Sequence, residues 1–134
     1  MTKTIDNMNI IITKEDLKNL INVLISFRES LDINISIALF RNRNSDKIPT
    51  IRLNVVSKSK NFVEFQLQSI VDSRPTGTVS NQFAIPDEYN EDSLNVLIEL
   101  LDNLISHFTS YYYMDKVIKE CGFDININLN VKED

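Results

Sequence analysis

The sequence has one cysteine, one histidine and two glycines among its 134 residues, and it has no tryptophan. Because a disulfide needs two cysteines, none can form within the chain, which fits either a reducing compartment or simply a fold that needs no disulfide. Zinc sites draw most of their three or four ligands from Cys and His, so Cys121 and His107 alone do not indicate one. With only Gly77 and Gly122, the chain builds neither a phosphate-binding loop nor a dinucleotide fingerprint. We therefore expect no metal, no cofactor and no catalytic residues, and a protein that is not an enzyme.

Long apolar runs are also missing. The most apolar stretch, residues 94–105, is interrupted by Asn95, Glu99, Asp102 and Asn103, whereas a membrane-spanning helix needs about 20 mostly apolar residues. Met1, Thr2, Lys3 and Thr4 do not begin the long apolar run of a signal peptide, so we expect none. We expect a cytoplasmic protein without membrane contact. A hydrophobic content of 43% is enough to fill the core of a single α+β domain spanning residues 1–134.

Hydrophobic spacing predicts two helices and several strands. Apolar residues recur at helical spacing over residues 14–31, after a Thr13 cap, and again from residue 91 to about 121, after a cap at Asn90 or Asp92. The second helix is either long or broken near Ser110. Alternating apolar and polar residues predict strands at 8–12, 33–40, 51–56, 63–71, 79–85 and 125–131.

The element order β-α-β-β-β-β-α-β, with short polar connections, predicts an α+β fold. We expect a single, mainly antiparallel sheet of about five to six strands with two helices packed on one face. The other face is then bare and rich in amides, which both donate and accept hydrogen bonds and so suit recognition of a partner. A merely hydrated face is the alternative. The outward residues expected are Asn34, Ser36, Phe40, Arg52, Asn54, Glu64, Gln66, Gln68, Asn126, Asn128 and Asn130.

Charge is divided along the chain. Residues 41–74 carry seven basic and three acidic side chains, whereas residues 75–134 carry eleven acidic and three basic ones. Because Arg binds phosphate and carboxylate through paired donors, the basic segment predicts an anion-binding patch. Lys and Arg that guard strand edges against aggregation are the alternative. If the patch binds a ligand, Arg41, Arg43, Arg52 and Arg74 should converge on one pocket.

Three consecutive tyrosines, Tyr111, Tyr112 and Tyr113, cannot all point inward from a helix, so at least one ring faces solvent. Exposed tyrosines are favoured in interfaces. We therefore expect a partner to bind through these tyrosines and through Asn54, Gln66 and Gln68. A homodimer that uses either the amide-rich face or the long helix is also expected.

The formal net charge of −5 argues against direct binding of nucleic acid, although the acidic C-terminal half could face a basic partner protein. The 18 Ile and 16 Asn indicate an AT-rich coding sequence. In size, acidity and composition the chain resembles small inhibitor and immunity proteins of low-GC bacteria and their phages, without sharing a motif with them. The main hypothesis is a non-catalytic binding protein that acts by stoichiometric contact with a protein target. The alternative is a small-molecule-binding protein that captures an anion such as a nucleotide through Arg residues.

Overall fold

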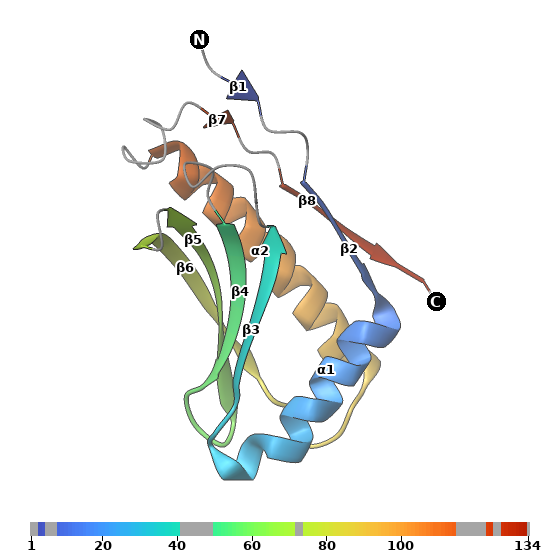
Figure 1. The fold of residues 1–134 in the computed structure, drawn as a ribbon. Helices are drawn as coiled ribbons and strands as arrows, with labels where there is room; N and C mark the ends of the chain where they lie inside the picture. The colour runs from blue at the N-terminus through green and yellow to red at the C-terminus, as the bar shows by residue number, and fades with distance from the viewer. Residues whose placement is uncertain are drawn as a thin grey trace.

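Four strands with alternating apolar residues pair in sequence order to form an antiparallel sheet (Figure 1). They are β3 (Asn34–Phe40), β4 (Thr50–Ser57), β5 (Phe62–Val71) and β6 (Arg74–Ala84). The antiparallel sheet expected from the sequence is therefore confirmed. The structure is a computed structural model that describes the backbone of residues 3–4, 8–40, 50–71, 74–114, 123–124 and 127–133, and the side chains of residues 11–37, 51–70, 77–108 and 129–133.

The first and last strands lie apart from this sheet. β2 (Met8–Thr13) pairs in parallel with β8 (Ile127–Lys132), and the short β1 (Lys3–Thr4) pairs in parallel with β7 (Phe123–Asp124). The expectation of one sheet of five to six strands was wrong in this respect. Alternation identifies a half-buried strand but does not identify its neighbour, and here the whole intervening chain forms the long crossover that parallel strands need.

Helix α1 (Lys14–Phe27) begins at the cap expected from the sequence: the side-chain oxygen of Thr13 accepts a hydrogen bond from the backbone N–H of Asp16 at 3.0 Å. Leu17, Ile21 and Leu24 recur every three to four residues and are buried. A 3₁₀ turn, η1 (Arg28–Ser30), follows, and Leu31 then adopts a left-handed conformation with φ of 54°. The chain reverses there to enter β3.

Helix α2 (Glu91–Met114) is capped by Asn90 rather than Asp92. The backbone N–H of Ser93 donates to Asn90 Oδ1 at 2.8 Å, and the backbone N–H of Asn90 donates to Ser93 Oγ at 3.4 Å. This reciprocal pair satisfies donors that a helix start leaves free. The helix continues past Ser110, so it is long and unbroken there, and Cys121 and Gly122 lie outside the described residues. Of the described helices, none combines the length and apolar character needed to span a membrane.

One hydrophobic core joins these elements. Helix α2 lies against the inner face of β5 and β6, and α1 packs against α2 (Figure 1). Within the core, the rings of Phe65 and Phe83 meet edge to face with their centroids 6.0 Å apart. Both helices therefore contribute to a core on one side of the sheet, as expected. The largest fully buried side chains are Phe65, Phe83, Phe108, Ile21, Leu24, Ile51, Leu67, Leu97 and Leu104.

Candidate functional site: the outward face of the sheet

The strand register places polar side chains from all four strands on the face of the sheet that points away from the helices. Ser36, Asn54, Gln66 and Ser80 form one row across the sheet, because each residue lies opposite the next in the register. Residues opposite each other on one sheet face have Cβ atoms about 4.5–5.5 Å apart, so their side chains meet. We call this surface the amide face; its described residues include Asn34, Ser36, Arg52, Asn54, Val56, Phe62, Glu64, Gln66, Gln68, Thr78, Ser80, Gln82 and Ala84.

Hydrogen bonds between strands fix the orientation of several of these side chains. Ser36 Oγ donates to Asn54 Oδ1 at 2.9 Å, and Gln68 Nε2 donates to Thr78 Oγ1 at 3.1 Å. Each bond uses only part of an amide, which has two N–H donors and an oxygen acceptor. Among the described residues, the Nδ2 donors of Asn54 and the Oε1 acceptor of Gln68 have no hydrogen bond. The amide face therefore presents oriented donors and acceptors to solvent.

The two ionisable groups on the amide face have different surroundings. Glu64 accepts a hydrogen bond from Gln66 Nε2 and lies 3.6 Å from Lys58 Nζ, so its charge is compensated. Arg52 lies opposite Gln68 and is half-buried, yet within the described part of the chain its guanidinium has neither an ion pair nor a hydrogen bond. Arg52 thus presents a guanidinium with five N–H donors that have no partner among the described residues, between Gln68 on β5 and Ala38 on β3.

The structure brings together some of the residues expected at a site. Asn54, Gln66, Gln68 and Arg52 lie side by side on the amide face. Arg74 begins β6 opposite Val71, but its side chain is not described. Arg41 and Arg43 also lie outside the described residues. The convergence of the four arginines on one anion-binding pocket therefore stays a prediction. The backbone of Tyr111, Tyr112 and Tyr113 belongs to the last turns of α2, and their side chains are likewise not described.

Two parts of the expected outward face need revision. Asn128 and Asn130 belong to β8, which pairs with β2 and not with the four-stranded sheet, so they do not extend the amide face. Thr78, Ser80 and Gln82 on β6 do belong to it and were missed. The signal was in the sequence, because residues between the inward-facing Val79 and Phe83 must alternate with outward-facing ones.

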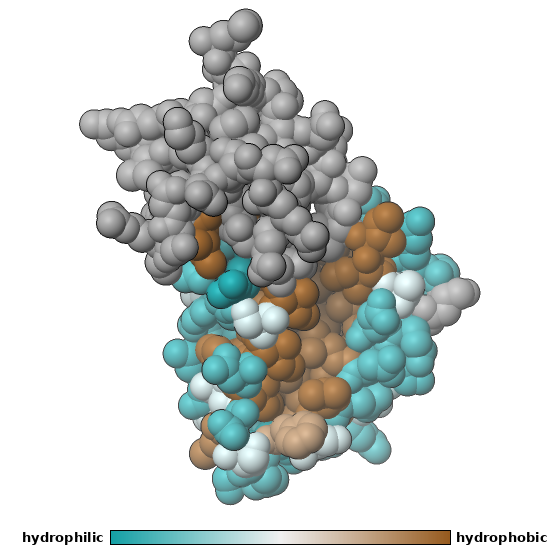
Figure 2. All heavy atoms as spheres, viewed as in Figure 1, coloured by the Kyte–Doolittle hydropathy of each residue, from teal (hydrophilic) through white to brown (hydrophobic). Residues whose placement is uncertain are grey.

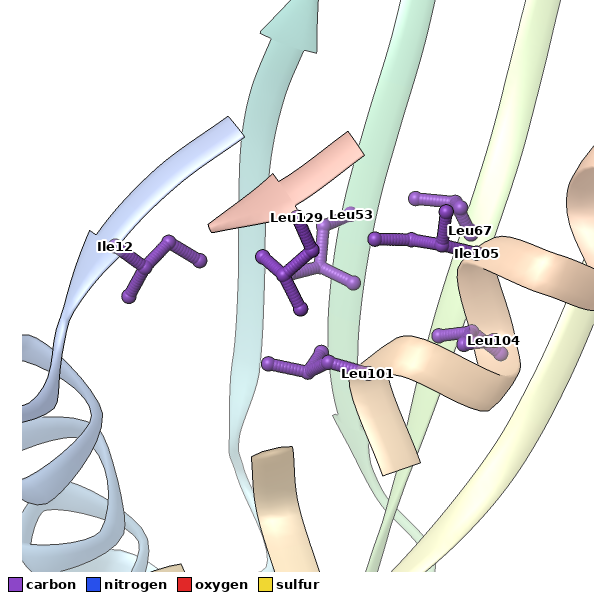
Figure 3. Close-up of a pocket in the computed structure, with 7 residues that line it drawn as sticks. All are labelled: Ile12, Leu53, Leu67, Leu101, Leu104, Ile105 and Leu129. Carbon is purple, nitrogen blue, oxygen red and sulfur yellow. The ribbon is translucent and has the colours of Figure 1, made fainter. Parts of the chain in front are cut away.

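A small pocket lies elsewhere, between the sheet, α2 and the parallel β2–β8 pair (Figure 3). It offers about 20 Å³ of solvent-accessible volume, about the space of one water molecule. All its lining side chains are aliphatic, so it contains no group that could orient a polar ligand. The residues are Ile12, Leu53, Leu67, Leu101, Leu104, Ile105 and Leu129.

The described residues of the amide face include one carboxylate and neither histidine nor cysteine. This carboxylate, Glu64, is already engaged with Lys58 and Gln66, and the described part of the chain contains no group of three or more His, Cys, Asp or Glu residues suited to a metal ion. His107 is exposed on α2. The chain matches no protein-family model, no curated protein and no solved structure.

Proposed function

We propose that this protein is a non-catalytic binding protein that makes stoichiometric contact with a protein target through the amide face. The observation that supports this proposal is Arg52, a half-buried cation without a described partner, which lies beside the amides of Gln68 and Asn54 that retain free hydrogen-bonding capacity. Interface cores are poor in charged residues but enriched in Arg, and this surface has that composition. The target would place a carboxylate against Arg52 and backbone or amide groups against Asn54 and Gln68.

An inhibitor or immunity role agrees with this mode of action, because such proteins act by occupying a surface of their target. The acidic charge of the chain would favour a basic target by long-range attraction. Local contact at Arg52 and global attraction are separate contributions: the first fixes orientation and lifetime, and the second accelerates encounter. A target with a basic surface and one exposed carboxylate meets both requirements.

The alternative, capture of a small anion such as a nucleotide, is favoured by the same unpaired guanidinium. Arg52 could supply paired donors to phosphate oxygens, and Gln68 beside it could add another. Small-molecule sites are usually concave, however, and the small pocket described above is lined by aliphatic side chains and does not include Arg52. A protein target therefore suits the outward face of the sheet better than a nucleotide does.

The experiment is affinity capture from the native host with wild-type protein, Arg52→Glu and Lys132→Glu. The last variant is the matched control, because it makes the same charge change at an exposed site on β8. We expect one protein to be captured in a constant molar ratio by wild type and by Lys132→Glu, and to be lost with Arg52→Glu. Equal capture by all three proteins would contradict a site at Arg52.

Calorimetric titration with ATP and with inorganic phosphate tests the alternative, capture of a small anion. Binding heat that is present in wild type and Lys132→Glu but absent in Arg52→Glu would support this alternative.

A further inference from the structure

Strand β3 is an open edge of the four-stranded sheet, because among the described strands only β4 pairs with it. A backbone hydrogen bond between β4 and the residue before β3 shows which backbone groups of β3 point to the open side. The N–H of Ser57 donates to the carbonyl of Ile33 at 2.9 Å, so Ile33 points its backbone toward β4. Alternate residues of a strand point to alternate sides, and Asn34, Ser36 and Ala38 therefore point their N–H and C=O groups away from β4. These groups are available to another strand.

The two edges of the sheet differ in how well they are protected. Natural edge strands are commonly guarded by charged side chains, proline or bulges. Strand β6, at the far edge, includes Arg74, Pro75 and Gly77. Strand β3 has the sequence Asn-Ile-Ser-Ile-Ala-Leu-Phe, with no charge and no proline, and its irregular register lies at its end, between Ala38 and Phe40. The regular part of β3 is thus an unguarded pairing edge.

This edge is complementary to a copy of itself. An antiparallel pairing about a twofold axis at Ser36 places Asn34 opposite the partner's Ala38, and each such pair exchanges two backbone hydrogen bonds. It also places Ile35 opposite the partner's Ile37, so apolar side chains meet on the inner face. We infer that two copies of this chain associate through β3 and form one continuous eight-stranded sheet. The contact is isologous, and no like charges meet within the paired strands.

Exposed apolar side chains occur on this edge and in the segment that leads into it. Ile37 on β3 is 43% exposed, and Phe27 and Leu31, which precede β3 in the chain, are 56% and 51% exposed. Figure 2 shows apolar surface uncovered between the strands and α1 on this side of the molecule. A seven-residue strand spans only about 23 Å, and a stable interface buries about 1,000 Å² or more in total. These side chains supply the apolar area that strand pairing alone lacks.

One further feature agrees with a second copy as the occupant. Leu31 ends the 3₁₀ turn in a left-handed conformation, with φ of 54°, and its side chain is 51% exposed although it is apolar. The turn accounts for this backbone conformation, whereas a contact with a second copy would account for an exposed leucine in a conformation that glycine or asparagine adopts more readily.

The dimer does not depend on the proposed function, because it uses the backbone edge of β3 and the inner face, whereas the target would contact the outward face. For the proposed function, the dimer would change the extent and symmetry of the surface that contacts the target. The two amide faces become one surface that presents two copies of Arg52, related by the twofold axis at Ser36. A dimeric target with twofold symmetry, or two monomeric targets, would fit that surface.

The first experiment is sedimentation equilibrium of the full chain and of two proline variants. In Ser36→Pro the lost N–H is one that points to the open edge, so pairing with β4 is kept and pairing with a second copy is blocked. Ser80→Pro is the matched control: Ile85 N–H donates to the carbonyl of Asn61, and by the same alternation the N–H of Ser80 points away from β5 at the far edge. We expect about twice 15.5 kDa for wild type and Ser80→Pro, and 15.5 kDa for Ser36→Pro. A wild-type mass of 15.5 kDa across micromolar dilutions, or a dimeric Ser36→Pro, would overturn the inference.

If both proline variants are monomeric, a disulfide cross-link tests whether two copies of the chain pair through β3. In a Cys121→Ser background, Ser36→Cys places two thiols across the twofold axis, where paired Cα atoms lie about 5.5 Å apart, within the range that a disulfide spans. Ser80→Cys is the control at the other edge. Mild oxidation should convert most Ser36→Cys protein to a covalent dimer and leave most Ser80→Cys protein monomeric. Equal cross-linking of the two variants, or none in Ser36→Cys, would overturn pairing through β3.

Discussion

Arg52 lies directly opposite Gln68 in the register of β4 and β5, on the face of the sheet that the helices leave uncovered. The two side chains are neighbours, but Gln68 directs its amide N–H to Thr78 on β6 at 3.1 Å. Arg52 thus lies beside a hydrogen-bonding side chain but has no described partner for its charge. A residue of this kind contributes little to the fold and leaves its binding capacity for another molecule.

The first prediction separates the contribution of Arg52 to the stability of the fold from its contribution to binding. Arg52→Ala should change the free energy of unfolding by less than about 0.5 kcal/mol, because surface substitutions that break no ion pair or hydrogen bond stay within that range. Binding of the target should fall by a factor on the order of 30 or more, since truncating one member of a desolvated charge pair costs about 2 kcal/mol or more. Urea denaturation and a binding titration measure the two effects. A loss of stability above about 1.5 kcal/mol would show that Arg52 serves the fold.

The second prediction concerns the core. Phe65→Ala should lower the free energy of unfolding by about 3–5 kcal/mol, because the side chain is fully buried and its removal leaves a cavity beside Phe83. Phe62→Ala, on the same strand but 42% exposed, is the matched control and should cost less than about half as much. Urea denaturation of both variants provides the comparison. Similar losses for the two variants would mean that Phe62 contributes as much to the hydrophobic core as Phe65 does.

The sequence predicted local structure well because each element has its own signal. Thr13 and Asn90 are typical cap residues, and the inward-facing Val63, Phe65 and Leu67 alternate as one side of a strand must. These signals depend on neighbours within a few residues. The partner of a strand depends on the whole chain, which is why the parallel pairing of β2 with β8 was missed.

The sequence predicted several residues of the candidate site, but it did not predict which strands contribute to it. Alternation alone was enough to place Arg52, Asn54, Gln66 and Gln68 on one face. The contribution of β6 and the separation of β8 required the register, which no single segment encodes. Likewise, nothing in the sequence Asn34–Phe40 marks β3 as an edge, and its lack of protective residues became informative only once its single neighbour was known.

The third prediction tests the cap of α2. Asn90→Ala should lower the free energy of unfolding by about 1 kcal/mol, because the Oδ1 atom of Asn90 accepts the hydrogen bond from Ser93 N–H at 2.8 Å. Asn95→Ala makes the same substitution at an exposed position inside the helix, where Ala has the higher helix propensity. That control should leave stability unchanged or raise it by up to about 0.6 kcal/mol. Losses of equal size in both variants would rule out a specific capping role.

The last prediction uses the strained backbone of Leu31 to separate stability of the monomer from association. With φ of 54°, Leu31 occupies a region that Asn tolerates better than leucine. In the monomeric Ser36→Pro background, Leu31→Asn should raise the free energy of unfolding by roughly 1 kcal/mol, and Leu31→Val should lower it, because β-branched residues fit this region worst. Without the Ser36 change, Leu31→Asn should weaken the dimer, because an exposed apolar side chain next to β3 is lost. Urea denaturation and a sedimentation dilution series measure the two effects, which have opposite signs. If Leu31→Asn lowers both stability and association, the leucine contributes to the monomer fold itself, and the strain cannot be attributed to a contact between copies.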